Sequence, residues 1–306
     1  MEPASRAIGA VVDYPGARAP ERTRSVDAFG GRLVVHEWGE ASAPPLLLLH
    51  GGFDFARTFD VFAPLLAAGG FRVIAWDQRG HGRSGQTQLY SWDADVRDAY
   101  AVLESTSAAP LVAVGHSKGG GVLMQLAHAL PGRFTRFVSI DGIPARRPSA
   151  DSTAPEPSLH EIATEWLDHR RATATFVRKP GTPEELARRR QRMNPRLPLA
   201  WLRYLVSVGA QQDADGWRWL VDPMLRFGGF GPWQPEWVLE RLRRFPVPLQ
   251  VILGGIHEPM GMGATLASVR PHLPAGASLH CLDDSGHFVH IEKPHEVAKL
   301  ALGFLT

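Results

Sequence analysis

The chain has 306 residues, of which 44% are hydrophobic and 21% are charged. This length and composition predict a globular protein with a sizeable core, built as one large domain or as a core with an insertion. A formal net charge of +2 is too small to indicate a nucleic-acid partner. The single cysteine, Cys281, excludes an internal disulfide framework and a thiolate metal cluster.

Residues 1–24 contain acidic residues and prolines but no continuous apolar stretch, so they do not resemble a signal peptide. We expect them to form a loose N-terminal arm. No part of the sequence approaches the ~20 apolar residues that a membrane-spanning helix needs. A soluble cytoplasmic protein without a membrane partner is therefore expected, and a homo-oligomer is compatible with this expectation.

Residues 25–29 and 32–38 flank a pair of glycines and predict a hairpin of two strands. Short apolar runs predict further strands at residues 46–49, 72–76, 110–114, 137–140, 249–253 and 278–282. Apolar residues at helical spacing predict helices between them, near residues 59–66, 96–103, 118–130 and 297–304. This alternation predicts an α/β fold, a mostly parallel sheet with helices on both faces, formed by residues 25–144 and 246–306.

Residues 145–245 interrupt this alternation and predict an inserted, mainly helical segment that begins with a linker rich in Pro, Ser and Ala. The segment is rich in tryptophan. We therefore expect a lid whose aromatic side chains line a pocket for an apolar substrate. The candidate substrate-binding residues are Trp166, Trp201, Trp217, Trp219 and Trp233. The arginine run at residues 188–190 is interpreted as a solvated helix face.

A Gly-His-Ser-Lys-Gly motif at residues 115–119 lies between a predicted strand and a predicted helix. Glycines two residues before and two residues after Ser117 let the strand and the helix approach closely. The turn exposes the hydroxyl group, and the N-terminus of the helix favours developing negative charge. This context predicts that Ser117 is a nucleophile, whereas the His116 side chain is expected to point away from it and to pack.

A serine hydroxyl needs a histidine to accept its proton. His287 follows the last predicted strand, at the sheet edge where Ser117 also lies, and is our candidate base. His280, His290 and His295 lie in the same segment, inside the strand or on the helix side, and are interpreted as packing or surface residues.

The base in turn needs a carboxylate that orients it. Glu258 is the first acid after the predicted strand at residues 249–253, and it is our first choice. Asp141, which follows the preceding strand, is the alternative acid. Asp283 and Asp284 are too close in sequence to His287 to be the first choice and are expected to shape its loop.

An oxyanion hole needs backbone amides near the nucleophile. The amide of Lys118 is expected to supply one, and the amide of Gly52 or Phe53 the other. The sequence does not decide between these two residues. The ammonium group of Lys118 is free to pair with Asp141 or Asp54, or to meet a substrate oxygen.

The order serine, acid, histidine on this strand pattern resembles the α/β-hydrolase superfamily, in its serine-nucleophile, lid-containing branch. Three segments carry the resemblance: Leu-Leu-Leu-Leu-His-Gly-Gly at 46–52, Asp-Gln-Arg-Gly-His-Gly-Arg-Ser at 77–84, and Asp-Ser-Gly-His at 284–287. The resemblance implies that the turn at 77–84 is structural rather than catalytic. Glu258 stands where the family more often has Asp.

These residues together predict a serine hydrolase that cleaves a carboxylic ester or lactone of a bulky apolar or aryl small molecule through an acyl-enzyme. Carbon–carbon bond hydrolases and perhydrolases use the same triad and remain alternatives, as does a non-hydrolytic, receptor-like ligand-binding protein. The sequence shows no Walker-type motif, no dinucleotide-binding glycine motif and no zinc-ligand spacing. We therefore expect no cofactor and no metal.

Overall fold

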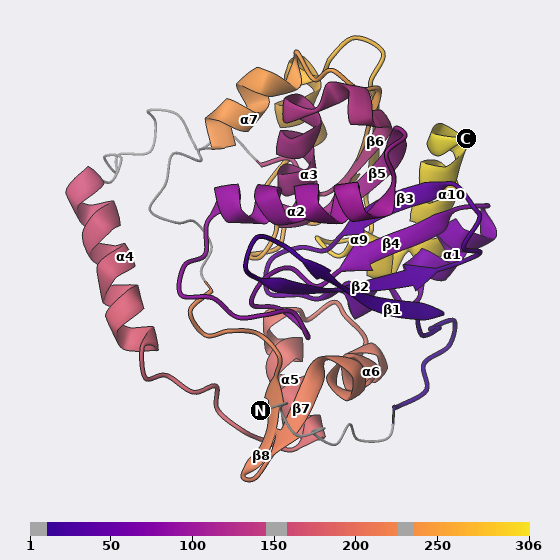
Figure 1. Ribbon diagram of the computed structural model, residues 1–306. Coiled ribbons are helices and arrows are strands. Elements are labelled where there is room, and N and C mark those ends of the chain that lie inside the picture. The colour runs from indigo at the N-terminus through magenta and orange to yellow at the C-terminus, as the bar shows by residue number, and fades with distance from the viewer. Residues whose placement is uncertain (1–10, 145–157, 226–234) are drawn as a thin grey trace.

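The computed structural model describes residues 11–144, 158–225 and 235–306 (Figure 1). Most of the predicted linker and Trp233 lie outside the described residues. No helix among the described residues has the length and the apolar content that crossing a bilayer requires.

An eight-stranded sheet forms the centre of the described chain, in the order β1-β2-β4-β3-β5-β6-β9-β10. Its first two strands pair in antiparallel fashion, β2 is antiparallel to β4, and the remaining strands are parallel. The strands are β1 (Arg22–Asp27), β2 (Arg32–Trp38), β3 (Pro45–Leu49), β4 (Arg72–Trp76), β5 (Leu111–His116), β6 (Phe134–Ile140), β9 (Leu249–Gly254) and β10 (Ser278–Leu282). The predicted α/β fold with a mostly parallel sheet is confirmed.

The sheet is buried on both faces, which explains why its central strands read as continuous apolar runs. Successive side chains of a strand point to opposite faces, so Leu47 and Leu49 of β3 belong to one core cluster and Leu46 and Leu48 to the other. The first face is covered by α2 (Trp92–Thr106), α3 (Lys118–Ala129) and α7 (Pro235–Leu242), and the second by α1 (Phe62–Ala68) and α10 (Pro294–Leu305). Two short helices, α8 (Leu266–Val269) and α9 (Val289–Glu292), complete the C-terminal part.

Helix α7 corrects the predicted end of the insertion at residue 245. Its side chains Val238, Leu239 and Leu242 lie in the same core cluster as α2 and α3. The helix therefore covers the sheet, and the described part of the insertion ends before it.

The insertion, residues 158–225 as described, contains α4 (Leu159–Thr173), α5 (Pro183–Met193), α6 (Leu199–Gly209), β7 (Ala210–Asp213) and β8 (Gly216–Trp219). The β7–β8 hairpin was not predicted, because only helical spacing was recognised in this segment. Helices α5 and α6 lie together at one end of the sheet (Figure 1). They share a core cluster with Phe55 and Phe288, which lie in loops of the sheet domain.

Residues 11–21, expected to be loose, are docked on the insertion and on the segment of the sheet domain that precedes α1. The Val12 amide donates to the Ser207 hydroxyl oxygen at 3.1 Å, and the Tyr14 ring packs edge-on against Trp201 at 4.8 Å between centroids. The Arg18 amide donates to the Asp60 carbonyl at 2.8 Å. The expectation of a loose arm is wrong for this part of the chain.

Candidate active site

Ser117 occupies the turn between β5 and α3 with φ 52° and ψ −127°, a backbone conformation that side-chain-bearing residues rarely adopt. The glycines of the motif allow this turn. A Cβ at Gly115 would lie 2.5 Å from Gly120 Cα, and one at Gly119 would lie 2.3 Å from the Leu49 carbonyl oxygen. The strand and the helix therefore approach closely at both glycines, as predicted.

The structure brings Ser117 and His287 together. The Ser117 hydroxyl lies 3.0 Å from Nε2 of His287, although their sequence positions are 170 residues apart. Nδ1 of the same ring lies 2.5 Å from a carboxylate oxygen of Asp141. All three side chains are buried. In this chain of hydrogen bonds the Nδ1–H group donates to Asp141, which leaves Nε2 free to accept the serine proton.

The acid at His287 is therefore Asp141, and our first choice, Glu258, is wrong in geometry. Asp141 directly follows β6, which lies between β5 and β9 in the sheet. Glu258 lies four residues beyond the end of β9, and its carboxylate accepts the backbone amide of His287 at 2.6 Å. Glu258 thus holds the main chain of the histidine loop, the role that we had expected of Asp283 and Asp284.

A second carboxylate and an arginine from the insertion also hold the histidine loop. Glu292 accepts the Gly286 amide at 2.9 Å. Arg196, which lies between α5 and α6, donates to Glu292 at 2.8 Å and to the carbonyl of Asp284 at 2.6 Å. The backbone around His287 is consequently fixed by charge-assisted hydrogen bonds from three directions.

His116 has a more specific role than packing. Its Nε2–H group donates to the carbonyl oxygen of His287 at 2.9 Å, and the two ring centroids lie 4.7 Å apart. The next ring, His290, lies 4.4 Å from His116. Burial, followed by the neighbouring imidazoles His290 and His287, holds the pKa of His116 well below its usual range. His116 is therefore a neutral donor that supports the backbone of the candidate base.

The segment at residues 50–54, which we call the oxyanion loop after the role expected of it, lies against Ser117. A Cβ at Gly51 would be 3.0 Å from the Cβ of Ser117. The Phe53 amide donates to Nε2 of His81 at 3.1 Å, so it is already engaged. Within the described chain, the amides of Gly52 and Lys118 form no hydrogen bond. The geometry therefore favours Gly52 over Phe53 as the partner of Lys118 in an oxyanion hole.

Two buried histidines join the oxyanion loop to the turn at residues 77–84. His81 donates through Nδ1 to the Arg79 carbonyl at 2.9 Å while accepting from Phe53. His50 donates through Nδ1 to the Gly51 carbonyl at 2.7 Å and accepts the Gln78 amide at 3.0 Å. Burial lowers the pKa of both rings, which keeps them neutral and able to accept.

Asp77 organises the same turn, in keeping with a structural role for this motif. Its carboxylate accepts the Ala56 and Arg83 amides, each at 2.8 Å. Burial raises its pKa, but the His36 ring, whose Nε2 lies 3.7 Å from a carboxylate oxygen of Asp77, and these two amides hold the pKa below the usual value. Asp77 is thus an ionised anchor that links the turn to the chain after the oxyanion loop.

The Lys118 side chain pairs with neither Asp141 nor Asp54. Its ammonium group lies 2.7 Å from a carboxylate oxygen of Asp95 and 5.9 Å from the ring centroid of Trp92, both on α2. The side chain therefore ties the start of α3 to α2, while the backbone amide remains directed by the turn at Ser117.

The predicted tryptophans occupy different environments. Trp201 is 1% exposed and packs between Tyr14 and Tyr204, which is a core position of the insertion. Trp217 and Trp219 of β8 are half-buried against the same cluster, and Trp166 is half-buried on α4. Trp219 lies 6.3 Å from Phe55 between ring centroids, which places it beside the loop that follows Phe53.

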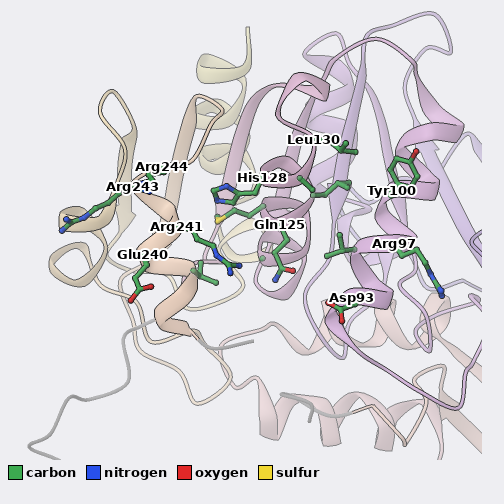
Figure 2. Close-up of a pocket in the computed structure, with 16 residues that line it drawn as sticks. Asp93, Arg97, Tyr100, Gln125, His128, Leu130, Glu240, Arg241, Arg243 and Arg244 are labelled. Carbon is green, nitrogen blue, oxygen red and sulfur yellow. The ribbon is translucent and has the colours of Figure 1, made fainter. Parts of the chain in front are cut away.

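A groove of about 1300 Å³ lies between α2, α3 and α7, away from the candidate triad. Figure 2 shows Gln125 and His128 on its α3 side and Glu240 and Arg241 on its α7 side. None of the three triad residues lines this groove. The described residues also contain no group of three or more His, Cys, Asp or Glu side chains arranged to hold a metal ion.

Known proteins resemble this chain in sequence. The model of the alpha/beta hydrolase family matches residues 46–300. The sn-1-specific diacylglycerol lipase of Xenopus tropicalis is 26% identical over 280 residues, covering 87% of this chain and 79% of that protein. The non-heme chloroperoxidase of Streptomyces lividans is 34% identical over 117 residues, covering 38% of this chain and 42% of that protein.

Solved structures share the fold over nearly the whole chain. A thioesterase domain from the curacin biosynthetic pathway has a TM-score of 0.77 at 24% identity, covering 92% of this chain and 99% of that one. A hypothetical protein from Pseudomonas aeruginosa has a TM-score of 0.77 at 25% identity, covering 92% of this chain and 98% of that one.

Proposed function

Because the chain belongs to the alpha/beta hydrolase family, we propose that it is a serine hydrolase that cleaves a carboxylic ester or lactone through an acyl-enzyme at Ser117. The observation that carries the proposal is the continuous hydrogen-bond chain from Ser117 through His287 to Asp141, with distances of 3.0 and 2.5 Å. The lipase name of the Xenopus tropicalis relative supports an ester substrate.

In the proposed reaction, the Ser117 hydroxyl oxygen attacks the substrate carbonyl while Nε2 of His287 takes its proton. The carbonyl oxygen becomes an oxyanion that the amides of Gly52 and Lys118 receive at the N-terminus of α3. His287 then gives its proton to the departing alcohol oxygen as the ester bond breaks. Asp141 remains ionised throughout and stabilises the imidazolium.

The acyl-enzyme is cleared by the same groups acting on water. His287 removes a proton from a water molecule, whose oxygen attacks the acyl carbon and forms a second oxyanion. Breakdown of this intermediate returns the proton to the Ser117 oxygen and releases the carboxylic acid. The reaction needs no group beyond the chain and water.

We propose a bulky apolar acyl or aryl group as the substrate part that faces the insertion. Support comes from the half-buried Trp217 and Trp219 on β8 and from Phe55 beside them. Aromatic and aliphatic side chains with few polar partners suit an apolar ligand. In this proposal the insertion acts as a lid, and the protein works on a small-molecule substrate in the cytoplasm.

A perhydrolase is the second candidate, because the Streptomyces lividans relative is named a chloroperoxidase. Hydrogen peroxide would then replace water in the second step and release a peracid. The triad is compatible with both outcomes, since the acyl-enzyme is the same. The two candidates differ in whether peroxide accelerates breakdown of the acyl-enzyme.

Labelling with a fluorophosphonate, followed by peptide mass spectrometry, tests the nucleophile without knowledge of the substrate. We expect adduct formation at Ser117 and none in the Ser117→Ala protein. Nitrophenyl esters of increasing chain length and several aryl lactones, each with and without hydrogen peroxide, then separate the substrate classes. A protein that binds an apolar ligand tightly but is neither labelled nor active would support the receptor-like alternative and contradict the proposal.

A further inference from the structure

Arg190 reaches from α5 of the insertion to both loops of the candidate active site. One terminal nitrogen donates to the carbonyl oxygen of Phe53 at 2.9 Å. Another lies 3.8 Å from a carboxylate oxygen of Asp54, and the guanidinium carbon lies 5.8 Å from the ring centroid of Phe288, next to His287. The side chain is 12% exposed. The expectation of a solvated face for the run at 188–190 is therefore wrong for Arg190.

The neighbouring arginines make contacts of a different kind. Arg188 pairs with Glu184 on the same helix at 2.8 Å. Arg189 donates to the carbonyls of Lys179 and Pro180, each at 3.0 Å, so its bonds stay within the insertion. Of the three, Arg190 alone joins the insertion to the oxyanion loop, and Arg189 offers a matched comparison.

The residue that Arg190 holds is strained. Phe53 has φ 58°, in the left-handed region, which is unfavourable for a residue with a side chain. Its peptide groups are held on both sides, by His81 at the N–H group and by Arg190 at the carbonyl oxygen. The torsion at Phe53 sets the orientation of the peptide that joins it to Gly52. Release of the carbonyl would let this torsion relax and turn the Gly52 backbone.

The negative charge of the Asp54 carboxylate also stabilises the position of the Arg190 side chain. Asp54 is 1% exposed, and neither of its carboxylate oxygens has a hydrogen-bond partner among the described residues. A buried carboxylate without hydrogen bonds is costly unless a cation lies near it. The guanidinium group of Arg190 supplies that cation from the insertion side.

We propose that Arg190 is a positioning residue that keeps the oxyanion loop in its active conformation, so that docking of α5 and assembly of the oxyanion hole occur together. The inference rests on the proposed function, because it takes the Gly52 amide as an oxyanion donor. Arg190 acts through Phe53 and Gly52 and need not touch the substrate. Its loss should therefore lower the rate of the chemical step rather than substrate affinity.

The test compares the rate of fluorophosphonate labelling at Ser117 in the wild type, Arg190→Met, Arg190→Lys and Arg189→Met proteins. We expect labelling of Arg190→Met to slow by about 10–100-fold, since a misplaced donor of this kind costs up to about 10² in rate. Arg190→Lys should recover part of the rate, because it keeps the charge but not the planar fork. Arg189→Met should stay within about 2-fold of the wild type, because its lost bonds lie within the insertion.

Steady-state kinetics on an accepted ester add a second readout, in which kcat falls and KM stays nearly constant. Three results would each overturn the inference while leaving the proposed function intact. They are labelling of Arg190→Met at the wild-type rate, a loss of labelling rate in Arg189→Met equal to that in Arg190→Met, and a change in Arg190→Met that is confined to a higher KM. Absence of labelling in the wild type would overturn both. Should Arg190→Met fail to fold, Arg190→Lys decides: slower labelling at an unchanged melting temperature supports the inference, and labelling at the wild-type rate overturns it.

Discussion

Ser117 and Asp141 both have positive φ angles, 52° and 43°, and both directly follow a strand of the sheet. The Ser117 amide donates to the Ile140 carbonyl at 3.0 Å, and the Asp141 amide donates to the Ile252 carbonyl at 2.8 Å. These bonds continue the ladder of parallel strands one step beyond each strand end. The sheet thereby holds two strained residues in the conformations that direct their side chains toward His287.

Replacing Ser117 by Ala should abolish turnover and leave the fold intact. We expect kcat/KM to fall by at least about 10⁴-fold, since no other group can accept the acyl chain. The melting temperature should change by no more than ~2 °C, because only a hydroxyl group is lost. Residual activity within tenfold of the wild type would show that the nucleophile is elsewhere.

Asp141→Asn and Glu258→Gln form a matched pair that tests the assignment of the acid. An amide at position 141 would favour the wrong tautomer of His287, so kcat should fall by about 10⁴ with little change in KM. A glutamine at position 258 still offers an oxygen to the His287 amide, and we expect at most about a 10-fold loss. An inactive Glu258→Gln protein beside a normal Asp141→Asn protein would return the role to Glu258.

Ser117 and His287 could be predicted from sequence because strand–turn–helix and strand–loop patterns around them are local. The acid that contacts His287 could not be predicted in the same way, because Asp141 and Glu258 both lie between Ser117 and His287 in the sequence. The choice depends on the strand order β5-β6-β9-β10, which no local pattern records. The contacts of Arg190 with Phe53 and Asp54 could not be predicted either. A run of arginines has the same sequence pattern whether its side chains are exposed to solvent or packed against another segment.

At the scale of elements, α3 packs so closely on the sheet that there is no room for a Cβ at Gly119 in its first turn. A Cβ at Gly119 would meet the backbone oxygens of Leu49 and His50 at 2.3 and 2.5 Å. Backbone atoms cannot move aside as the end of a side chain can. The insertion differs, because α5, α6 and the β7–β8 hairpin pack in a third cluster beside the two clusters of the sheet. The turn of the hairpin contains Gly216, with φ 135°, and it was not predicted because charged and tryptophan residues surround this glycine in the sequence.

Gly119→Ala and Gly303→Ala should therefore have opposite effects on stability. The clash at Gly119 should destabilise the fold by more than about 2 kcal/mol or prevent folding. Gly303 lies exposed on α10 with no atom within 4 Å of a built Cβ, so alanine should stabilise the protein by about 0.5–1 kcal/mol. Urea unfolding at constant m-value measures both effects. Equal tolerance at the two sites would contradict the close contact between α3 and β3.

At the scale of the whole molecule, buried imidazoles make stability depend on pH. His290 lies among Phe59, Phe62 and His116, and neither ring nitrogen has a hydrogen-bond partner among the described residues. Burial, followed by the nearby His287, lowers the pKa of His290 to about 3. Below pH ~6.5 the unfolded chain binds a proton at this histidine and the folded chain does not.

Stability contributed by the neutral His290 is therefore complete above pH ~6.5 and is lost as the pH falls toward 3. Each pH unit in this window costs about 1.4 kcal/mol per such histidine. His290→Phe should flatten the fall in melting temperature between pH 6.5 and 4.5. The variant and the wild type are compared first at pH 8, where the difference reports packing alone. Parallel curves at all pH values would show that His290 does not contribute to acid sensitivity.

The docking of Val12 and Tyr14 on α6 also bears on how the chain folds. Val12 and its partner Ser207 lie 195 residues apart in the chain. During synthesis Val12 and Tyr14 leave the ribosome long before α6 exists, so the surface on which they pack is not yet present. Contacts that close so long a loop form slowly, because the entropy of loop closure is lost before the contacts stabilise the fold. Val12 and Tyr14 should therefore be among the last residues to reach their final positions. We expect them to pack on the insertion only after the sheet domain has folded.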